Sequence, residues 1–225
     1  MLDQLLRDIT KMVPSPVNER KTVFDDWLHD QQKGSPALHL PNLALMGTGS
    51  DYTVFFDHLG IPSVDMIFNR QGTSVYPYHS NYDSYYWLEH FGDVGFKKHR
   101  AMAQIFGLLA VRLAGCKLIQ FEARGYSASL QRHLAVLKSK EEDKPLDWGV
   151  LESAMTAFTS ATQKLDLKAR ELTTKDVPNR DAADLDLAVL NRKYIDLERG
   201  FLLDKNHGLP GRPWYRHMVR RQRTH

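Results

Sequence analysis

A single histidine, His79, stands in a loop of aromatic and polar side chains that reads YPYHSNYDSYYW over residues 76–87. A neutral imidazole can bind a metal ion when another group orients its second ring nitrogen. Asp83 is a candidate for that group, although it can equally cap a helix that follows the loop. A lone histidine is also commonly a structural residue, so both a metal-binding role and a structural role stay open for His79.

The remaining sequence does not add the other ligands of a catalytic metal centre at a recognisable spacing. It contains no HExxH segment, no closely spaced pair of histidines and no HxD segment. Its one cysteine, Cys116, excludes an intrachain disulfide and a thiolate zinc cluster. A two-zinc site needs about five or six protein ligands, with a bridging carboxylate, and a general base. This chain alone is therefore not expected to assemble such a site.

The second segment that could contribute to a functional site is GTGSDYTVFFDHLGIPS at residues 47–63. It opens with a loop rich in glycine and serine. Ser50 or Asp51 can cap a short helix after the loop, and Gly60 can end that helix. The apolar side chains that the helix carries are Val54, Phe55 and Leu59. Gly49 can serve as a turn glycine and Ser50 as a helix cap, and either residue can also line a binding cleft.

Short apolar segments on both sides of this loop and helix predict an α/β arrangement. Residues 43–46 have the pattern of a buried strand, and residues 63–68 have the pattern of another. Further upstream, residues 2–9 and 22–29 have the apolar spacing of two helices, and Pro14 ends the first. The order strand, loop, helix, strand is typical of an α/β sandwich.

The sequence after residue 93 changes to helical periodicity, with four sets of apolar residues at intervals of three and four. The sets are His99, Met102, Phe106, Leu109 and Leu113; Leu130, Leu134 and Leu137; Leu151, Ala154, Phe158, Ala161 and Leu165; and Leu187, Leu190, Tyr194, Leu197 and Phe201. The last two sets fit the packing of one helix on another. We expect the boundary between the α/β part and this helical part near residues 115–122.

The composition and charge are those of an ordinary globular chain with a basic end. The 225 residues are 42% hydrophobic and 25% charged, and no run approaches the roughly 18 apolar residues of a membrane span. Residues 212–225 hold five arginines and no acid, and without them the net charge of +3 becomes −2. No nucleic-acid motif accompanies this basic end, so nucleic acid is not an expected partner. The segment at residues 1–11 does not have the pattern of a signal peptide.

Five segments together resemble one known family, and they are GTGSDYTVFF, LGIPS, YPYHSNYDSYY, LNRKYIDLERGFL and GLPGRPWYRH. From residue 2 to residue 218 the chain resembles the C-terminal portion of the glutamate carboxypeptidase and transferrin receptor family of co-catalytic zinc exopeptidases. The resemblance implies a fold that is α/β followed by all-α. It implies part of the zinc-peptidase α/β lobe at residues 1–117, a transferrin receptor-like helical dimerisation bundle at residues 118–219 and a non-family tail at residues 220–225.

The resemblance also assigns roles to individual residues. His79 matches the family's last zinc ligand, and Tyr78 resembles the neighbouring tyrosine that contacts substrate. Thr48, Gly49 and Ser50 match the loop that lines the substrate cleft. Of the two zinc ions in the family, this chain would contribute at most one ligand.

One departure from the family concerns substrate specificity. Members that act on acidic peptides carry two arginines on a strand where this chain reads SVDMIF, at residues 63–68. Asp65 in that segment would repel an anionic substrate residue and favour a free amino terminus or a basic side chain. This change favours an aminopeptidase-like specificity, and a purely structural role at a strand end is equally open for Asp65.

Other departures concern completeness. The resemblance implies that the remaining zinc ligands and the general base lie upstream of this chain, so no catalytic residue is assigned in it. The last residues, VRRQRTH, resemble nothing in the family. We therefore expect a C-terminal portion of a zinc-dependent exopeptidase with a peptide substrate, inactive alone and homodimeric through its helical domain. The alternative is a non-enzymatic dimerisation or interaction module of the transferrin receptor type, and the cellular compartment stays open.

Overall fold

The computed structural model of the chain describes residues 1–68, 76–139, 146–174 and 180–219. Its helices are α1 (Asp3–Met12), α2 (Val23–Gln32), α3 (Tyr85–Trp87), α4 (Lys97–Ala114), α5 (Ala123–Lys138), α6 (Gly149–Thr174) and α7 (Arg180–Arg199). Two short π-helical turns are η1 (Val54–His58) and η2 (Leu88–Gly92). The tail predicted at residues 220–225 lies outside the described residues.

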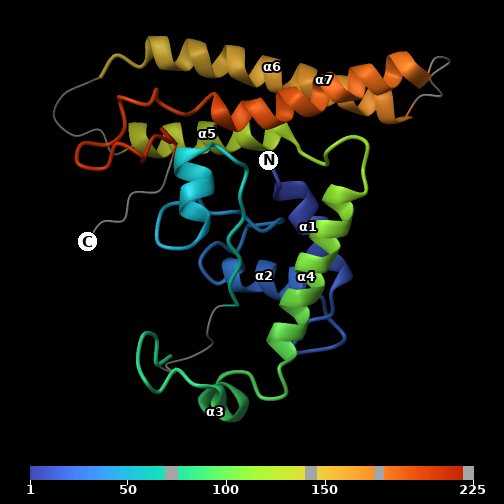
Figure 1. Ribbon diagram of the computed structural model, residues 1–225, viewed down its shortest axis with the longest axis vertical. Helices are drawn as coiled ribbons and strands as arrows, with labels where there is room; N and C mark the ends of the chain where they lie inside the picture. Colours follow the sequence, from blue (N-terminus) through green and yellow to red (C-terminus); the bar gives the residue numbers. More distant parts are fainter. Residues whose placement is uncertain (69–75, 140–145, 175–179, 220–225) are drawn as a thin grey trace. The chain divides into compact units, whose positions relative to one another are not determined.

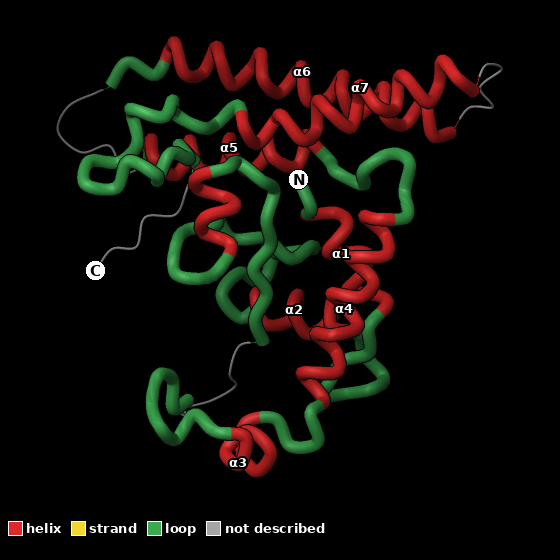
Figure 2. Tube along the Cα trace, in the orientation of Figure 1, coloured by secondary structure: helices red, strands yellow, loops and turns green. Residues whose placement is uncertain are grey.

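The strands expected at residues 43–46 and 63–68 are not formed (Figure 2). A strand needs a neighbour to accept and donate its backbone hydrogen bonds, and no other described segment pairs with either one. Within the described ranges, strand-like pairing is limited to isolated bridges, such as the one between Leu202 and His217. The α/β part of the predicted fold class is therefore not seen in this part of the chain, and it stays a prediction.

The chain divides into two compact units, each described here by itself. The first, called the α4 unit, consists of Leu5–Ala44 and Asp65–Ala114 and contains α2, α3, η2, α4 and most of α1. Its buried apolar residues are Leu5, Leu6, Ile9, Val13, Val23, Phe24, Ala101, Ile105 and Leu109. Both expected N-terminal helices are confirmed, and Thr22 caps α2 by accepting a hydrogen bond from the Asp25 amide while its own amide donates to the Asp25 carboxylate.

The buried side of α4 overlaps only in part with the side that the sequence predicted, because Leu109 belongs to both. Ala101, Ile105 and Leu109 are buried, whereas Phe106 is 48% exposed. Both sets follow helical spacing, and the expected set relied on the larger side chains. The small Ala101 permits a closer approach of neighbouring segments, so size alone does not identify the packed side of a helix.

The second unit, called the helical unit, consists of Met1–Gln4, Leu45–Val64 and Gly115–His225. Helix α6 packs along α5 and also along α7, as Figure 1 shows. The core at their junction contains Ala123, Ala169, Leu190 and Tyr194, with Leu118, Phe121, Leu165, Leu172 and Leu197 packed against it. The sequence periodicity of α6 and α7 is thus confirmed by helix-on-helix packing.

A buried carboxylate joins the three long helices of the helical unit. Asp166 on α6 accepts hydrogen bonds from the backbone amides of Ala123 and Arg124, at 3.0 and 2.8 Å, in the first turn of α5. It also accepts one from the Tyr194 hydroxyl on α7, at 2.8 Å. Amides in the first turn of a helix have no partner within that helix, so Asp166 caps α5 from a neighbouring helix. Burial, followed by the bond and the negative charge of Asp166, raises the pKa of Tyr194.

None of the helices in the described ranges has the length and apolar character needed to cross a bilayer.

Candidate functional site

The loop at residues 47–53 is held by one threonine hydroxyl. Gly49 has a φ of 109°, which glycine adopts without the strain that a side chain would bring. Its amide donates to Thr53 Oγ1 at 3.3 Å, and Thr53 Oγ1 donates to the Ser50 carbonyl at 2.6 Å. Ser50 and Gly49 are exposed, and Thr48 is half-buried. Ser50 therefore takes part through its carbonyl oxygen, and Thr53 organises the turn.

The short helix after this loop buries few of its apolar side chains. Phe56 and Asp57 of η1 are buried, whereas Val54, Phe55 and Leu59 are exposed. Gly60 follows with a φ of 60°, and a Cβ atom there would lie 2.9 Å from the Leu202 side chain. This close approach of η1 to the end of α7 requires glycine at position 60.

His79 and Tyr78 lie together in the α4 unit. Their rings stack with centroids 3.8 Å apart, and His79 has a left-handed φ of 57°. Both side chains are exposed to solvent. Asp83 accepts a hydrogen bond from the Tyr76 hydroxyl at 2.7 Å, and Ser84 rather than Asp83 caps α3. Neither role proposed for Asp83 in the sequence is therefore the one that it has in the structure.

The predicted site residues fall in both units. Tyr78, His79 and the exposed Asp65 belong to the α4 unit, and residues 48–50 belong to the helical unit. No three His, Cys, Asp or Glu side chains among the described residues lie close enough to hold a metal ion. His79 alone offers one imidazole, so the donor set in this part of the chain does not fit a zinc ion by itself.

The segment that follows α7 contacts η1 at several points. We call residues 201–219 the C-terminal strap. The amides of Arg216 and His217 both donate to the Asp57 carbonyl, at 2.9 and 3.2 Å. The Arg216 guanidinium donates to the carbonyls of Leu203, at 2.7 Å, and His58, at 3.3 Å. The His217 ring stacks on Phe56 with centroids 4.2 Å apart.

His217 is fully buried and also joins the strap to α5 and α7. Its Nε2 lies 2.9 Å from Glu198 Oε1, and its Nδ1 accepts a hydrogen bond from the Val219 amide. Because Nδ1 accepts, Nε2 is the nitrogen that donates to Glu198. The Tyr126 hydroxyl donates to the same Glu198 oxygen at 3.1 Å, and burial together with the Glu198 charge raises the pKa of Tyr126.

The signal for this cluster was present in the sequence. Glu198 lies in LNRKYIDLERGFL, His217 in GLPGRPWYRH and Phe56 in GTGSDYTVFF, which are three of the segments that carried the family resemblance. Their spacing along the chain gave no indication that they meet.

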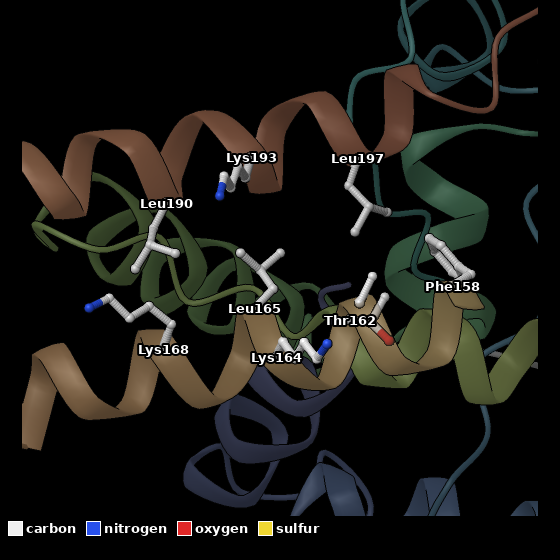
Figure 3. A pocket seen from close by; sticks show the side chains of 9 residues that line it. Phe158, Thr162, Lys164, Leu165, Lys168, Leu190, Lys193 and Leu197 are labelled. Atoms are coloured by element: carbon white, nitrogen blue, oxygen red, sulfur yellow. The ribbon is translucent and has the colours of Figure 1, made fainter. Parts of the chain in front are cut away.

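A pocket of about 420 Å³ lies between α6 and α7. Leu165 from α6 and Leu190 and Leu197 from α7 point into it, as Figure 3 shows, and three lysines line its borders. The lysines are Lys164, Lys168 and Lys193. None of the predicted substrate or metal residues lines this pocket.

Comparisons with known proteins agree along nearly the whole chain. Residues 146–225 match the transferrin receptor-like dimerisation domain. The chain is 32% identical over 219 residues to a probable glutamate carboxypeptidase of Arabidopsis thaliana and 37% identical over 230 residues to one of Arthroderma benhamiae. It is 30% identical over 220 residues to aminopeptidase NAALADL1 of Rattus norvegicus.

These alignments cover 97%, 97% and 93% of this chain, respectively, and 29% of the length of each relative. The chain thus spans under a third of the curated relatives that it matches. The match across separate segments, together with the helical packing at residues 146–174 and 180–199, identifies the chain as a member of the glutamate carboxypeptidase and transferrin receptor-like family.

Proposed function

We propose that this chain is the C-terminal portion of a zinc-dependent exopeptidase and that its helical part forms the homodimer. The observation that carries the proposal is the similarity of nearly the whole chain to proteins named glutamate carboxypeptidase and aminopeptidase. The domain division that goes with it is a peptidase part at residues 1–117 and a dimerisation part at residues 118–219. The partner strands for residues 43–46 and 63–68 would then come from the rest of the peptidase domain.

The surface offered to a second copy follows one side of α7 beside the pocket. Leu185, Val189 and Lys193 recur at four-residue spacing, so they lie along one side of the helix. Leu185 is 67% exposed and Val189 is 47% exposed, and Lys193 borders the apolar pocket. Apolar residues gathered in this way favour contact with another protein surface. The match of residues 146–225 to a dimerisation domain supports a second copy of this chain as the occupant.

Charges placed on this side should weaken the dimer. We expect the double variant Leu185→Glu/Val189→Glu to raise the dimer dissociation constant by at least about tenfold, because two apolar side chains would no longer be buried. Sedimentation velocity over a range of protein concentrations measures the change. Leu167→Glu on α6 is the matched control, since Leu167 is similarly exposed but is not part of the pocket side. If Leu167→Glu dissociates the dimer and the double variant does not, the dimer forms through another surface.

In the peptidase part, the proposal gives His79 the role of one zinc ligand and Tyr78 the role of a substrate contact. Thr48, Gly49 and Ser50 would line the substrate cleft. When bound, zinc would supply an activated water for hydrolysis of a terminal peptide bond. His79 is exposed, so its side chain is accessible to a ligand, and this supports the assignment.

The chain alone should bind zinc weakly, because one imidazole replaces the hydration shell of the ion poorly. Isothermal titration with zinc should show no submicromolar site that depends on His79. His79→Ala is the informative variant, and His90→Ala is its control, because His90 is another exposed histidine of the α4 unit. A tight site that disappears only in His79→Ala would mean that this chain holds further ligands.

Asp65 favours an aminopeptidase-like specificity within this proposal. Its side chain is exposed, so its charge is available to a substrate with a free amino group. The second candidate function is a non-enzymatic interaction module, and the match to a transferrin receptor-like dimerisation domain is what favours it. One measurement separates the two candidates, which is zinc-dependent release of a terminal residue from a peptide by the longer protein that would contain this chain. Only the first candidate requires this activity.

A further inference from the structure

The short helix η1 is fixed by the C-terminal strap from several directions within the helical unit. The carbonyl of Asp57 accepts two backbone hydrogen bonds, and the carbonyl of His58 accepts one from the Arg216 guanidinium. The ring of His58 also bonds to the Trp214 carbonyl at 3.1 Å. Carbonyls at the end of a helix have no partner within the helix, so the strap satisfies groups that would otherwise need water. Loss of these contacts should free η1.

The loop at residues 47–53 is joined to η1 through Thr53. The Thr53 amide and hydroxyl both donate to the Ser50 carbonyl, and the hydroxyl also accepts from the Gly49 amide. Thr53 directly precedes η1, so a movement of η1 shifts the group that shapes the loop. The exposed loop has few other anchors, and the remaining one in this segment is the bond from the Gly47 amide to the Tyr52 hydroxyl, at 3.3 Å.

The strap is in turn anchored on the helices of the dimerisation part. His217 bonds to Glu198 near the end of α7, and within the strap Arg216 bonds to the Leu203 carbonyl. Glu198 also accepts from Tyr126 on α5. A continuous series of packed and hydrogen-bonded groups therefore runs from α5 and α7 through the strap to η1.

We propose that Arg216 and His217 are positioning residues for the loop at residues 47–53, acting through η1 and Thr53. The proposal rests on the proposed function only in calling that loop part of the substrate cleft. It follows that the helical part sets the conformation of Gly49 and Ser50, in addition to forming the dimer. Substrate affinity and the integrity of the helical part would then be coupled within one subunit.

Hydrogen exchange of the backbone amides, followed by mass spectrometry on the 225-residue chain, tests this coupling. Peptides covering residues 47–53 and 54–61 report on the loop and on η1, and a peptide from the middle of α6 reports on global unfolding. Arg216→Ala should speed exchange by on the order of tenfold in both of the first two peptides and leave α6 unchanged, because the hydrogen bonds to Leu203 and His58 are lost. Unchanged exchange at residues 47–53 with faster exchange at residues 54–61 would overturn the proposal.

Thr53 provides the matched pair of variants. Thr53→Val removes the hydroxyl with little change in shape, so it should speed exchange on the order of tenfold at residues 47–53 and not at residues 54–61. Thr53→Ser keeps the hydroxyl and should restore the protection of the loop. If Thr53→Val leaves the loop protected, the link through Thr53 does not exist and the proposal is wrong.

A second strap variant covers the case in which Arg216→Ala unfolds the whole unit. His217→Gln keeps a donor for Glu198 and loses the stacking on Phe56, so it should loosen both reporter peptides while α6 stays protected. If the amides of residues 47–53 and 54–61 exchange no faster in this variant, the proposal is also contradicted. None of these measurements uses zinc or catalysis, so a failure of the proposed function would appear in the zinc and sedimentation experiments instead.

Discussion

Replacement of Asp166 by alanine should lower the free energy of unfolding of the helical unit by about 3 kcal/mol. The variant removes the acceptor for two amides in the first turn of α5, which is the loss of a helix cap. It also leaves the buried Tyr194 hydroxyl without its carboxylate partner. Urea denaturation followed by circular dichroism at helix wavelengths measures the change as a lower midpoint.

Two further variants separate these contributions. Tyr194→Phe removes only the hydroxyl and should cost about 1 kcal/mol. Combined with Asp166→Ala, it should add little, because the unpaired hydroxyl is no longer present. Asp184→Ala is the control for charge, since its ion pair with Lys117 is exposed and should contribute less than about 1 kcal/mol. Equal effects of Asp166→Ala and Asp184→Ala would show that Asp166 does not cap α5.

The helical unit should lose stability steeply above pH of about 10. Burial and the neighbouring carboxylates raise the pKa of Tyr126 and of Tyr194, so both stay protonated in the folded chain when they ionise in the unfolded chain. Their contribution is complete below the ordinary tyrosine pKa and is lost as the pH rises above it. Each tyrosine should lower the free energy of unfolding by about 1.4 kcal/mol per pH unit in that range. The urea midpoint of unfolding, measured at about four pH values between about pH 8 and pH 11, gives this slope.

Substitution by phenylalanine identifies the groups responsible for the alkaline loss. The double variant Tyr126→Phe/Tyr194→Phe should be less stable than the original chain at pH of about 8 but should have a much shallower slope at alkaline pH. Tyr82→Phe is the control, because Tyr82 is 79% exposed and lies outside the helical unit. An unchanged slope in the double variant would mean that other groups cause the alkaline loss.

At the candidate site, the residue types predicted the loop but not the hydrogen bonds within it. The motif around His79 predicted a loop, and the structure has that loop, with an exposed His79 stacked on Tyr78. The partner chosen for His79 was Asp83, because it is near in sequence. Tyr76 takes that carboxylate instead, since the turn brings its hydroxyl to 2.7 Å. Hydrogen-bond partners within a loop depend on backbone angles that residue types do not specify.

The amino-acid sequence by itself determined the positions of the long helices, because apolar residues recur along a helix at intervals of three and four. It also determined the family, through short segments whose order along the chain is specific. Strands at residues 43–46 and 63–68 could not be fixed in this way, because a strand exists only when another segment completes its hydrogen bonds.

Only the tertiary structure decided which polar residues are buried together. Asp166, Glu198 and His217 read as surface or tail residues, yet each is less than 10% exposed. A charged or polar group is stable in the interior only when partners from distant segments satisfy it, and those partners are Ala123, Tyr126 and Tyr194 on other helices. Such pairings have no periodicity along the chain, so they emerge only when the helices and the C-terminal strap are packed together.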